Sequence, residues 1–410
     1  MSRVEVFALG ASRKEESRTG APIITYYREV RLLIKRIQEI EALKVIESDF
    51  QRSKGYAPQN VSTWLTSSDF NKTMSKVIDV PFIEDPIEYF YTYSWDDSVL
   101  ESLLIKLLGR EQTDTFATCY PNTTIAIVNV ANLMRAIGVK RIAIITPAYF
   151  SIKHVVSSYG IEYVEYPMVM RDGILRLPID ELRKSSCEAI WVTSPVFSTS
   201  QYLVPEDIDF LGTISKKFII TDESFCLPGN ELLRWLLPSE NVIGIYSPHK
   251  AICVNSVKFS VIVAPARLAD LVYQWVDILA GNLSGSTRAA VEHYLTKNYD
   301  QCLSEFLLYM ARSRKALEEA TSARNDLKCN IGEIGSLYTI YHENAFLPKT
   351  LDLDFQRRLV FETGVSVYPG ILNDFPASVG YCYRVNLGIA DQTTPARLIR
   401  LWDYLLRYSS

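Results

Sequence analysis

The sequence lacks the features that would direct a protein to a membrane or to nucleic acid. No apolar run reaches the roughly 18 residues of a membrane span, and the N-terminus has no signal-peptide pattern. No basic run is present, and a net charge of −4 gives little electrostatic basis for binding a phosphate backbone. These absences predict a cytoplasmic protein that binds neither membranes nor nucleic acid.

Cysteine and histidine are also scarce, with seven cysteines and four histidines in 410 residues. The cysteines are odd in number and scattered, and none forms a Cys-x-x-Cys or Cys/His ligand pattern. We expect them to be reduced, mostly buried thiols, and we expect no metal site. They are Cys119, Cys187, Cys226, Cys253, Cys302, Cys329 and Cys382.

The composition is that of a globular protein, with 48% hydrophobic and 22% charged residues. Repeats, low-complexity segments and Gly/Ser linkers are missing. At roughly 100–200 residues per domain, the length predicts two or three structural units. A chain of this size can bury the large core that a deep pocket requires.

Short apolar runs alternate with helical patterns through the middle of the chain. Runs rich in Ile and Val without polar alternation are typical of strands buried on both faces, so we predict a mostly parallel α/β sheet. The last run follows its neighbour closely and is predicted to lie antiparallel at an edge. The six runs are 141–147, 162–167, 189–195, 217–223, 241–247 and 259–265.

The distribution of helical and strand patterns along the sequence divides the chain into three parts. Residues 1–80 are predicted to form an N-terminal segment that packs with a smaller domain, and residues 81–285 a large α/β domain. Residues 286–410 read as the smaller α+β domain, because helical patterns near 286–321, 355–363 and 394–408 enclose a few short strands. An amphipathic helix is also predicted over 98–108, ahead of the regular strand pattern.

Functional residues of α/β sheets gather just beyond the carboxyl ends of the strands. In this sequence those positions hold an acid at the tip of one run, Asp222, and a lysine just beyond the next, Lys250. A lysine that forms a Schiff base and a buried carboxylate that protonates a pyridine nitrogen are the two groups that a pyridoxal phosphate (PLP) enzyme needs.

From about residue 91 to 390 the chain resembles a divergent fold-type I, class I/II PLP-dependent aminotransferase. The segment TDESF resembles the family's Asp-Glu-x-Tyr turn, and YSPHKAICVNSVKFSVIVA resembles its Ser-x-x-Lys segment with a basic residue eight positions further on. The resemblance implies that Lys250 forms the Schiff base and that Asp222 pairs with the pyridine nitrogen. Ser247 and Lys258 would hold the phosphate.

Three further segments match the family in the same order along the chain. TPAYFS resembles the Pro-x-aromatic turn, which implies that Tyr149 stacks on the cofactor ring. CYPNTTIAI lies where the family has a phosphate turn at a helix N-terminus, so backbone and side chains of Asn122, Thr123 and Thr124 are phosphate candidates. YRVNLGIA resembles the C-terminal arginine segment, so Arg384 would clamp the substrate carboxylate through a bidentate pair.

The family resemblance implies a fold-type I architecture, in which a large, mostly parallel seven-stranded sheet domain carries the cofactor beside a smaller α+β domain. It also implies a homodimer, with either Tyr91 or Tyr93 reaching the phosphate across the interface.

The departures from the family pattern bear on the reaction. Phe197 and Phe225 replace an asparagine and a tyrosine that donate hydrogen bonds to the cofactor's phenolic oxygen, so the Schiff base should stay protonated over a wider pH range. Ser194 could supply a weaker substitute donor. Lys258 replaces an arginine, and His249 is an unusual neighbour of the lysine that is either an acid/base group or a structural histidine.

The leading hypothesis is transamination between an L-amino acid and a 2-oxo acid through Lys250. A second hypothesis keeps the cofactor and changes the reaction to cyclisation, elimination, decarboxylation or oxidation of a specialised amino acid. A third is a non-catalytic protein that uses the fold to bind a ligand. The first two differ in whether the amino group ends on the cofactor.

Overall fold

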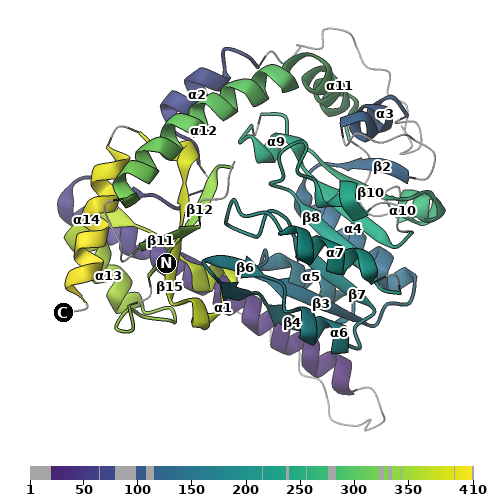
Figure 1. The fold of residues 1–410 in the computed structure, drawn as a ribbon, viewed down its shortest axis with the longest axis horizontal. Helices are drawn as coiled ribbons and strands as arrows, with labels where there is room; N and C mark the ends of the chain where they lie inside the picture. Colours follow the sequence, from purple (N-terminus) through teal and green to yellow (C-terminus); the bar gives the residue numbers. More distant parts are fainter. Residues whose placement is uncertain are drawn as a thin grey trace, which may run out of the picture.

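The structure is a computed structural model, drawn in Figure 1. It describes residues 20–78, 98–107, 115–322 and 327–408, apart from 64, 215, 237–239, 255, 276–282, 331–334, 343 and 392. Tyr91 and Tyr93, the residues expected at a subunit interface, lie outside the described residues.

A seven-stranded sheet forms the centre of the larger part, in the order β2-β10-β9-β8-β7-β3-β4. All strands except β10 run in the same direction, which confirms the mostly parallel α/β fold. The strands are β2 (Thr115–Tyr120), β3 (Arg141–Thr146), β4 (Glu162–Pro167), β7 (Ala189–Thr193), β8 (Phe218–Glu223), β9 (Val242–Tyr246) and β10 (Ser260–Pro265).

Two details of the predicted sheet are wrong. Strand β10 is antiparallel as expected, but it lies between β9 and β2 and not at an edge. The true edge strand β2 escaped recognition because its sequence, TFATCY, has few aliphatic residues, although every one of its side chains is buried. The other edge is β4, whose side chains are exposed or half-buried and not covered on both faces.

Helices cover both faces of this sheet because successive residues of each strand face opposite sides. Ile142 and Ile144 pack with one group of helices, whereas Ala143 and Ile145 belong to the core on the other face. The helices around the sheet are α3 (Ser98–Leu107), α4 (Thr123–Ala136), α5 (Ser151–Ser158), α6 (Ile179–Lys184), α7 (Pro205–Thr213), α8 (Leu232–Leu236), α9 (Pro248–Ala251) and α10 (Ala269–Trp275).

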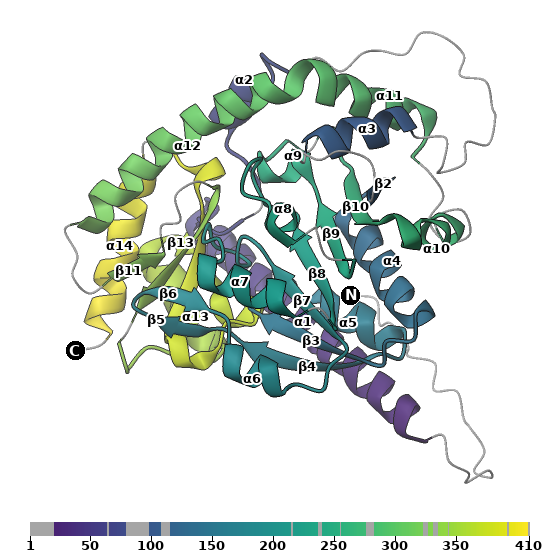
Figure 2. The ribbon, with the colours of Figure 1, turned by 45° about the vertical axis from the view of Figure 1, so that its right-hand side comes forward.

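The smaller part contains an antiparallel four-stranded sheet in the order β11-β12-β15-β14. Its elements are β11 (Leu327–Asn330), β12 (Leu337–His342), α13 (Leu353–Thr363), β13 (Val365–Ser366), β14 (Tyr368–Pro369), β15 (Tyr381–Asn386) and α14 (Thr394–Arg407). Figure 2 shows this part beside the large sheet, with α12 (Tyr299–Ser322) arching from one to the other.

The N-terminal elements lie against this smaller sheet unit. Helix α1 (Gly20–Lys54) packs on α13, and β1 (Gln59–Asn60) pairs parallel with β13. Helix α2 (Ser68–Met74) contacts α12. A separate hairpin, β5 (Val169–Arg171) and β6 (Ile174–Arg176), follows β4.

The predicted long helix near 286–321 is three joined segments. Helix α11 (Gly285–His293) passes into a π-helical turn (Tyr294–Asn298) and then into α12. Such turns occur singly inside α-helices. Here the side chain of Asn298 donates a hydrogen bond to the Val77 carbonyl, 3.1 Å away, and so ties the turn to the segment after α2.

Strand β8 buries a second carboxyl, that of Glu223, beside the Asp222 position. The Thr221 hydroxyl and the Leu233 N–H both donate to its Oε1, at 2.6 and 2.9 Å. Burial nevertheless raises the pKa of Glu223 from 4.5 to about 8, with a smaller contribution from the nearby Glu231. The folded protein therefore retains a proton on Glu223 at pH values where the unfolded chain has lost it.

We expect Glu223→Gln to flatten the pH dependence of stability. Because the folded pKa is raised, the stabilisation is complete below pH 4.5 and is lost as pH rises towards about 8. The wild-type slope in this window should reach about 1.4 kcal/mol per pH unit. Urea unfolding at several pH values measures it, with Glu181→Gln on exposed α6 as the control. Equal slopes for wild type and Glu223→Gln would contradict the assignment.

Candidate active site

The carboxyl ends of β3, β7, β8 and β9 meet at one edge of the large sheet because these strands are parallel. The residues that follow them therefore converge. The Ser194 N–H, just after β7, donates to the Asp222 carbonyl on β8 at 3.0 Å. Ser247 follows β9 directly and is the N-cap residue of helix α9, which carries Lys250. Four of the residues predicted from the sequence thus belong to one cluster.

The electrostatics of Asp222 and Lys250 are coupled. Burial raises the pKa of Asp222, while the Ser224 side chain and the Lys250 charge act in the opposite direction. The Ser224 hydroxyl donates to Asp222 Oδ1 at 2.5 Å and so orients the carboxylate. Burial lowers the pKa of Lys250, whereas the Asp222 charge raises it. The site therefore holds a carboxyl that gains from a cationic partner and an amine that deprotonates more easily than one in water.

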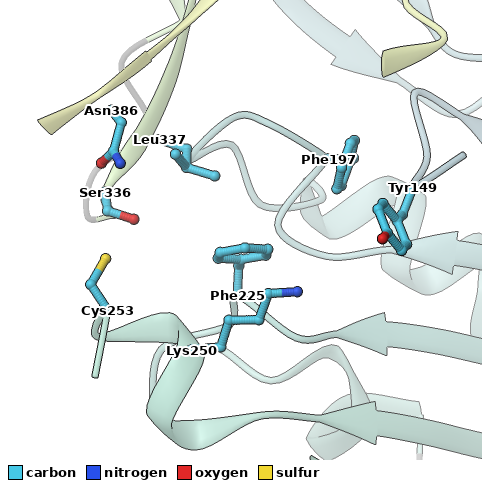
Figure 3. Close-up of a pocket in the computed structure, with 8 residues that line it drawn as sticks. All are labelled: Tyr149, Phe197, Phe225, Lys250, Cys253, Ser336, Leu337 and Asn386. Carbon is cyan, nitrogen blue, oxygen red and sulfur yellow. The ribbon is translucent and has the colours of Figure 1, made fainter. Parts of the chain in front are cut away.

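Lys250 lies in a cavity of about 240 Å³ between the two sheets. Its walls are mainly apolar, and Lys250 is the one charged side chain among the described residues that line it (Figure 3). The lining residues are Tyr149, Phe197, Phe225, Lys250, Cys253, Ser336, Leu337 and Asn386.

Phenylalanine occupies both positions where the resembled family has a hydrogen-bond donor. The Lys250 amine lies 4.4 Å from the centre of the Phe225 ring, a cation–π distance. The rings of Tyr149 and Phe197 are 5.9 Å apart on the side of the cavity towards which the lysine points (Figure 3). Neither phenylalanine can donate a hydrogen bond. The end of the cavity near Lys250 therefore has fewer hydrogen-bond donors than the asparagine and tyrosine of the resembled family would provide.

The phosphate candidates lie around the N-terminus of α4. Asn122 caps this helix, because its side chain accepts a hydrogen bond from the Ile125 N–H at 3.0 Å. The Thr123 hydroxyl lies 3.1 Å from that of Ser247. Thr124 and Lys258 are exposed, and the charge of Lys258 is close enough to lower the pKa of Lys250.

Sequence reasoning missed a third hydroxyl in this group. The Ser260 side chain is fully buried and lies 2.6 Å from Ser247 Oγ and 2.9 Å from Thr123 Oγ1. Ser260 is the first residue of strand β10 and follows Lys258 by two residues. No motif of the resemblance pointed there.

Arg384 lies in the middle of strand β15 and is only 2% exposed. Its Nε and one terminal nitrogen donate to the Ser62 carbonyl at 2.9 and 2.6 Å, and the other terminal nitrogen lies 3.4 Å from Ser198 Oγ. Burial lowers its pKa to about 9. Arg384 does not line the cavity, so its clamping of a carboxylate stays a prediction.

His249 lies beside Lys250 in sequence but away from the cavity. Its ring packs on Phe259, with centres 5.3 Å apart, and burial lowers its pKa to about 3. The imidazole is therefore neutral at physiological pH. This placement favours the structural reading of His249 over the acid/base reading, and the acid/base role stays an untested prediction.

The loop after β7 connects the two parts of the molecule at the cavity. The Ser200 hydroxyl donates to the Leu337 carbonyl at 2.5 Å, and the Thr339 hydroxyl donates to the Ser198 carbonyl at 2.8 Å. Gly335 makes this approach possible, because a Cβ atom there would lie 2.2 Å from Ser200 Oγ. The loop that carries Phe197 is thus tied to strand β12.

The described residues contain no group of three or more His, Cys, Asp or Glu residues arranged to hold a metal ion. Among the same residues, no helix combines the length and the hydropathy needed to cross a membrane.

No protein-family model matches the sequence, and no curated protein matches it either. The structure, in contrast, has the fold of the fold-type I PLP-dependent aminotransferases, as the resemblance implied. At identities below 20% to the solved structures, the likeness establishes the fold.

Three of these structures illustrate the likeness. Kynurenine aminotransferase from Pyrococcus horikoshii is 13% identical, with a TM-score of 0.70 over 90% of this chain and 94% of that one. N-succinyldiaminopimelate aminotransferase from Mycobacterium tuberculosis is 18% identical, with a TM-score of 0.65 over 87% and 96%. A PLP-bound C-S lyase from Staphylococcus hominis is 14% identical, with a TM-score of 0.63 over 86% and 88%.

Proposed function

We propose that the protein is a PLP-dependent aminotransferase that acts on an L-amino acid and a 2-oxo acid. The observation that carries the proposal is the placement of Asp222 and Lys250 together at the carboxyl edge of the parallel sheet, where Lys250 lines a cavity and the charges of the two side chains interact. The fold shared with solved aminotransferases supports the class of enzyme.

The residues present fit the cofactor chemically. Buried Asp222 gains from a cationic partner such as a pyridinium nitrogen, and the hydroxyls of Thr123, Ser247 and Ser260 can donate to a phosphate. Tyr149 would lie against the ring, and Lys250 would anchor the aldehyde carbon. When bound, PLP supplies a conjugated ring that withdraws electrons from the Cα–H bond of an amino acid.

Lys250 is then the group that moves the proton. An amine whose pKa is lowered by burial is more often neutral near pH 7, and so more often able to accept a proton from the substrate Cα. Asp222 would keep a proton on the pyridine nitrogen. Arg384 would orient the substrate by binding the substrate's carboxylate. The apolar walls formed by Phe197 and Phe225 limit water at the reacting atoms.

The test is to follow the amino group. Purified protein loaded with PLP is mixed with a panel of L-amino acids labelled with ¹⁵N, together with pyruvate and 2-oxoglutarate. Labelled alanine or glutamate, detected by mass spectrometry, is expected from at least one donor. Ammonia or a rearranged product without a labelled new amino acid would favour elimination, cyclisation, decarboxylation or oxidation over transamination.

The second candidate, a different PLP reaction, is favoured by one specific observation. Phe197 and Phe225 both line the cavity and neither offers a donor to the cofactor's phenolic oxygen. With fewer hydrogen-bond donors, the anionic form of the phenolic oxygen is stabilised less than in the resembled family. The electron distribution of the bound cofactor would therefore differ from that in the family. A PLP-bound C-S lyase, which is named for a reaction other than transamination, also has a fold similar to this one. The labelling experiment separates the two candidates.

Restoring one donor should change the titration of the bound cofactor. We expect Phe225→Tyr to lower the midpoint of the pH-dependent visible absorbance by about one to two pH units, because a hydrogen bond to a charged oxygen contributes roughly 1.5–3 kcal/mol. Spectrophotometric titration of the loaded protein measures this shift. The control is Phe150→Tyr, because Phe150 lies next to Tyr149 and does not line the cavity. An unchanged midpoint in Phe225→Tyr would refute the predicted role.

A further inference from the structure

Three buried or half-buried hydroxyls from three separate elements meet beside the candidate active site. Thr123 is the first residue of α4, Ser247 follows β9, and Ser260 begins β10. Their oxygens are 2.6, 2.9 and 3.1 Å apart, so each hydroxyl is within hydrogen-bond distance of the other two. Ser260 is the member that no motif of the sequence identified.

In a closed ring of three hydroxyls, each hydroxyl has a hydrogen-bond partner, but every hydroxyl proton is used within the ring. Each hydroxyl carries one hydrogen and two lone pairs, so in the ring each donates once and accepts once. Within the described residues, the Ser260 hydroxyl has no partner besides Ser247 and Thr123. Rotation of the three O–H bonds outward would present three donors to an anion without exposing an unpaired group.

We propose that Ser260 is a further phosphate-binding residue, whose hydroxyl donates to the cofactor phosphate together with Ser247 and Thr123. This inference rests on the proposed function, because it assigns a residue to the same cofactor. The bound group is identified by its chemistry, a phosphate ester with several acceptor oxygens at the N-terminus of the 14-residue helix α4.

The charge near the three hydroxyls explains why an extra donor is useful. Lys258 is exposed and presents one ammonium, whereas an arginine would present a planar fork that grips two phosphate oxygens at once. Ser260 lies two residues further along the chain, at the start of β10, and is completely buried. It therefore supplies, from inside the protein, a directed hydrogen bond that a solvated ammonium does not replace.

The test compares two ligands that differ only in the phosphate, PLP and pyridoxal. Dissociation constants for wild type and Ser260→Ala are measured by absorbance titration at equilibrium, so no turnover is required. We expect Ser260→Ala to weaken PLP binding about 10- to 100-fold, the range for losing a hydrogen bond to a charged group, and to leave pyridoxal binding unchanged. Ser157→Ala, a buried serine on α5, is the control and should change neither constant.

The outcomes separate this inference from the proposed function. If wild type binds both ligands and Ser260→Ala keeps the same ratio of PLP to pyridoxal affinity, Ser260 is a core residue and the inference is wrong. If wild type binds neither ligand, the proposed function fails and this inference fails with it. Should Ser260→Ala fail to fold, Ser260→Cys fills the same space with a weak donor and is expected to show the same selective loss for PLP.

Discussion

Lys250→Ala is expected to lose the long-wavelength absorbance of the PLP-loaded protein and at least about a thousand-fold in activity. Two functions disappear with the amine, namely the covalent anchor of the cofactor and the group that moves the Cα proton. The cavity itself should persist, because most of its lining comes from other elements. Visible spectra of wild type and variant, recorded with and without sodium borohydride, measure the anchor directly.

The control for this experiment is Lys217→Ala. Lys217 is half-buried and donates to the Ser185 carbonyl at 2.6 Å, at the opposite end of β8 from Asp222. It should retain both the absorbance and the activity. A Lys250→Ala variant that still forms a borohydride-reducible adduct would move the anchor to another lysine, and a wild type that takes up no PLP would remove the enzymatic proposal altogether.

Arg384→Ala is expected to lower kcat/KM for amino acids by about 10²- to 10⁴-fold, because two charge-assisted hydrogen bonds to the substrate carboxylate would be lost. The same variant should leave the small activity towards a primary amine without a carboxylate unchanged. Steady-state kinetics on an amino acid and on the corresponding amine measure this difference. An equal loss for both substrates would indicate a structural arginine.

A structural effect is a real alternative at this position, since Arg384 donates twice to the Ser62 carbonyl and its own carbonyl accepts a hydrogen bond from the Ser62 hydroxyl. Arg384→Lys is therefore the matched variant. It keeps the charge but loses the fork, and it should recover folding stability more than kcat/KM. Urea unfolding and PLP absorbance of both variants separate the two contributions.

The sequence predicts well those parts of the site whose position follows from the order of strands and helices along the chain. Asp222 and Lys250 follow neighbouring buried strands, and parallel strands bring such residues to one edge of a sheet. The predicted helices near 98–108, 355–363 and 394–408 lie where the structure has α3, α13 and α14, because their apolar residues repeat with a clear helical period.

The parts that the sequence does not predict depend on contacts between distant segments. The place of β10 inside the sheet depends on β2, a strand whose composition gives little signal. The partner of Arg384 is a backbone carbonyl from the N-terminal segment, and a carbonyl has no residue identity to recognise. Ser260 belongs to a hydroxyl group whose other members lie 13 and 137 residues away.

The loop that holds Phe197 has a consequence for how this protein could change over evolutionary time. The proposed cofactor residues Asp222, Ser247 and Lys250 lie at the end of β8 or just after β9 of the large sheet. Leu337 and Asn386, in contrast, reach the cavity from the small sheet. Hydrogen bonds from Ser200 and Thr339 join the two sides. Mutations on the small-sheet side could therefore alter which substrate is accepted while the cofactor seat stays intact, which makes that side the place to direct a mutant library.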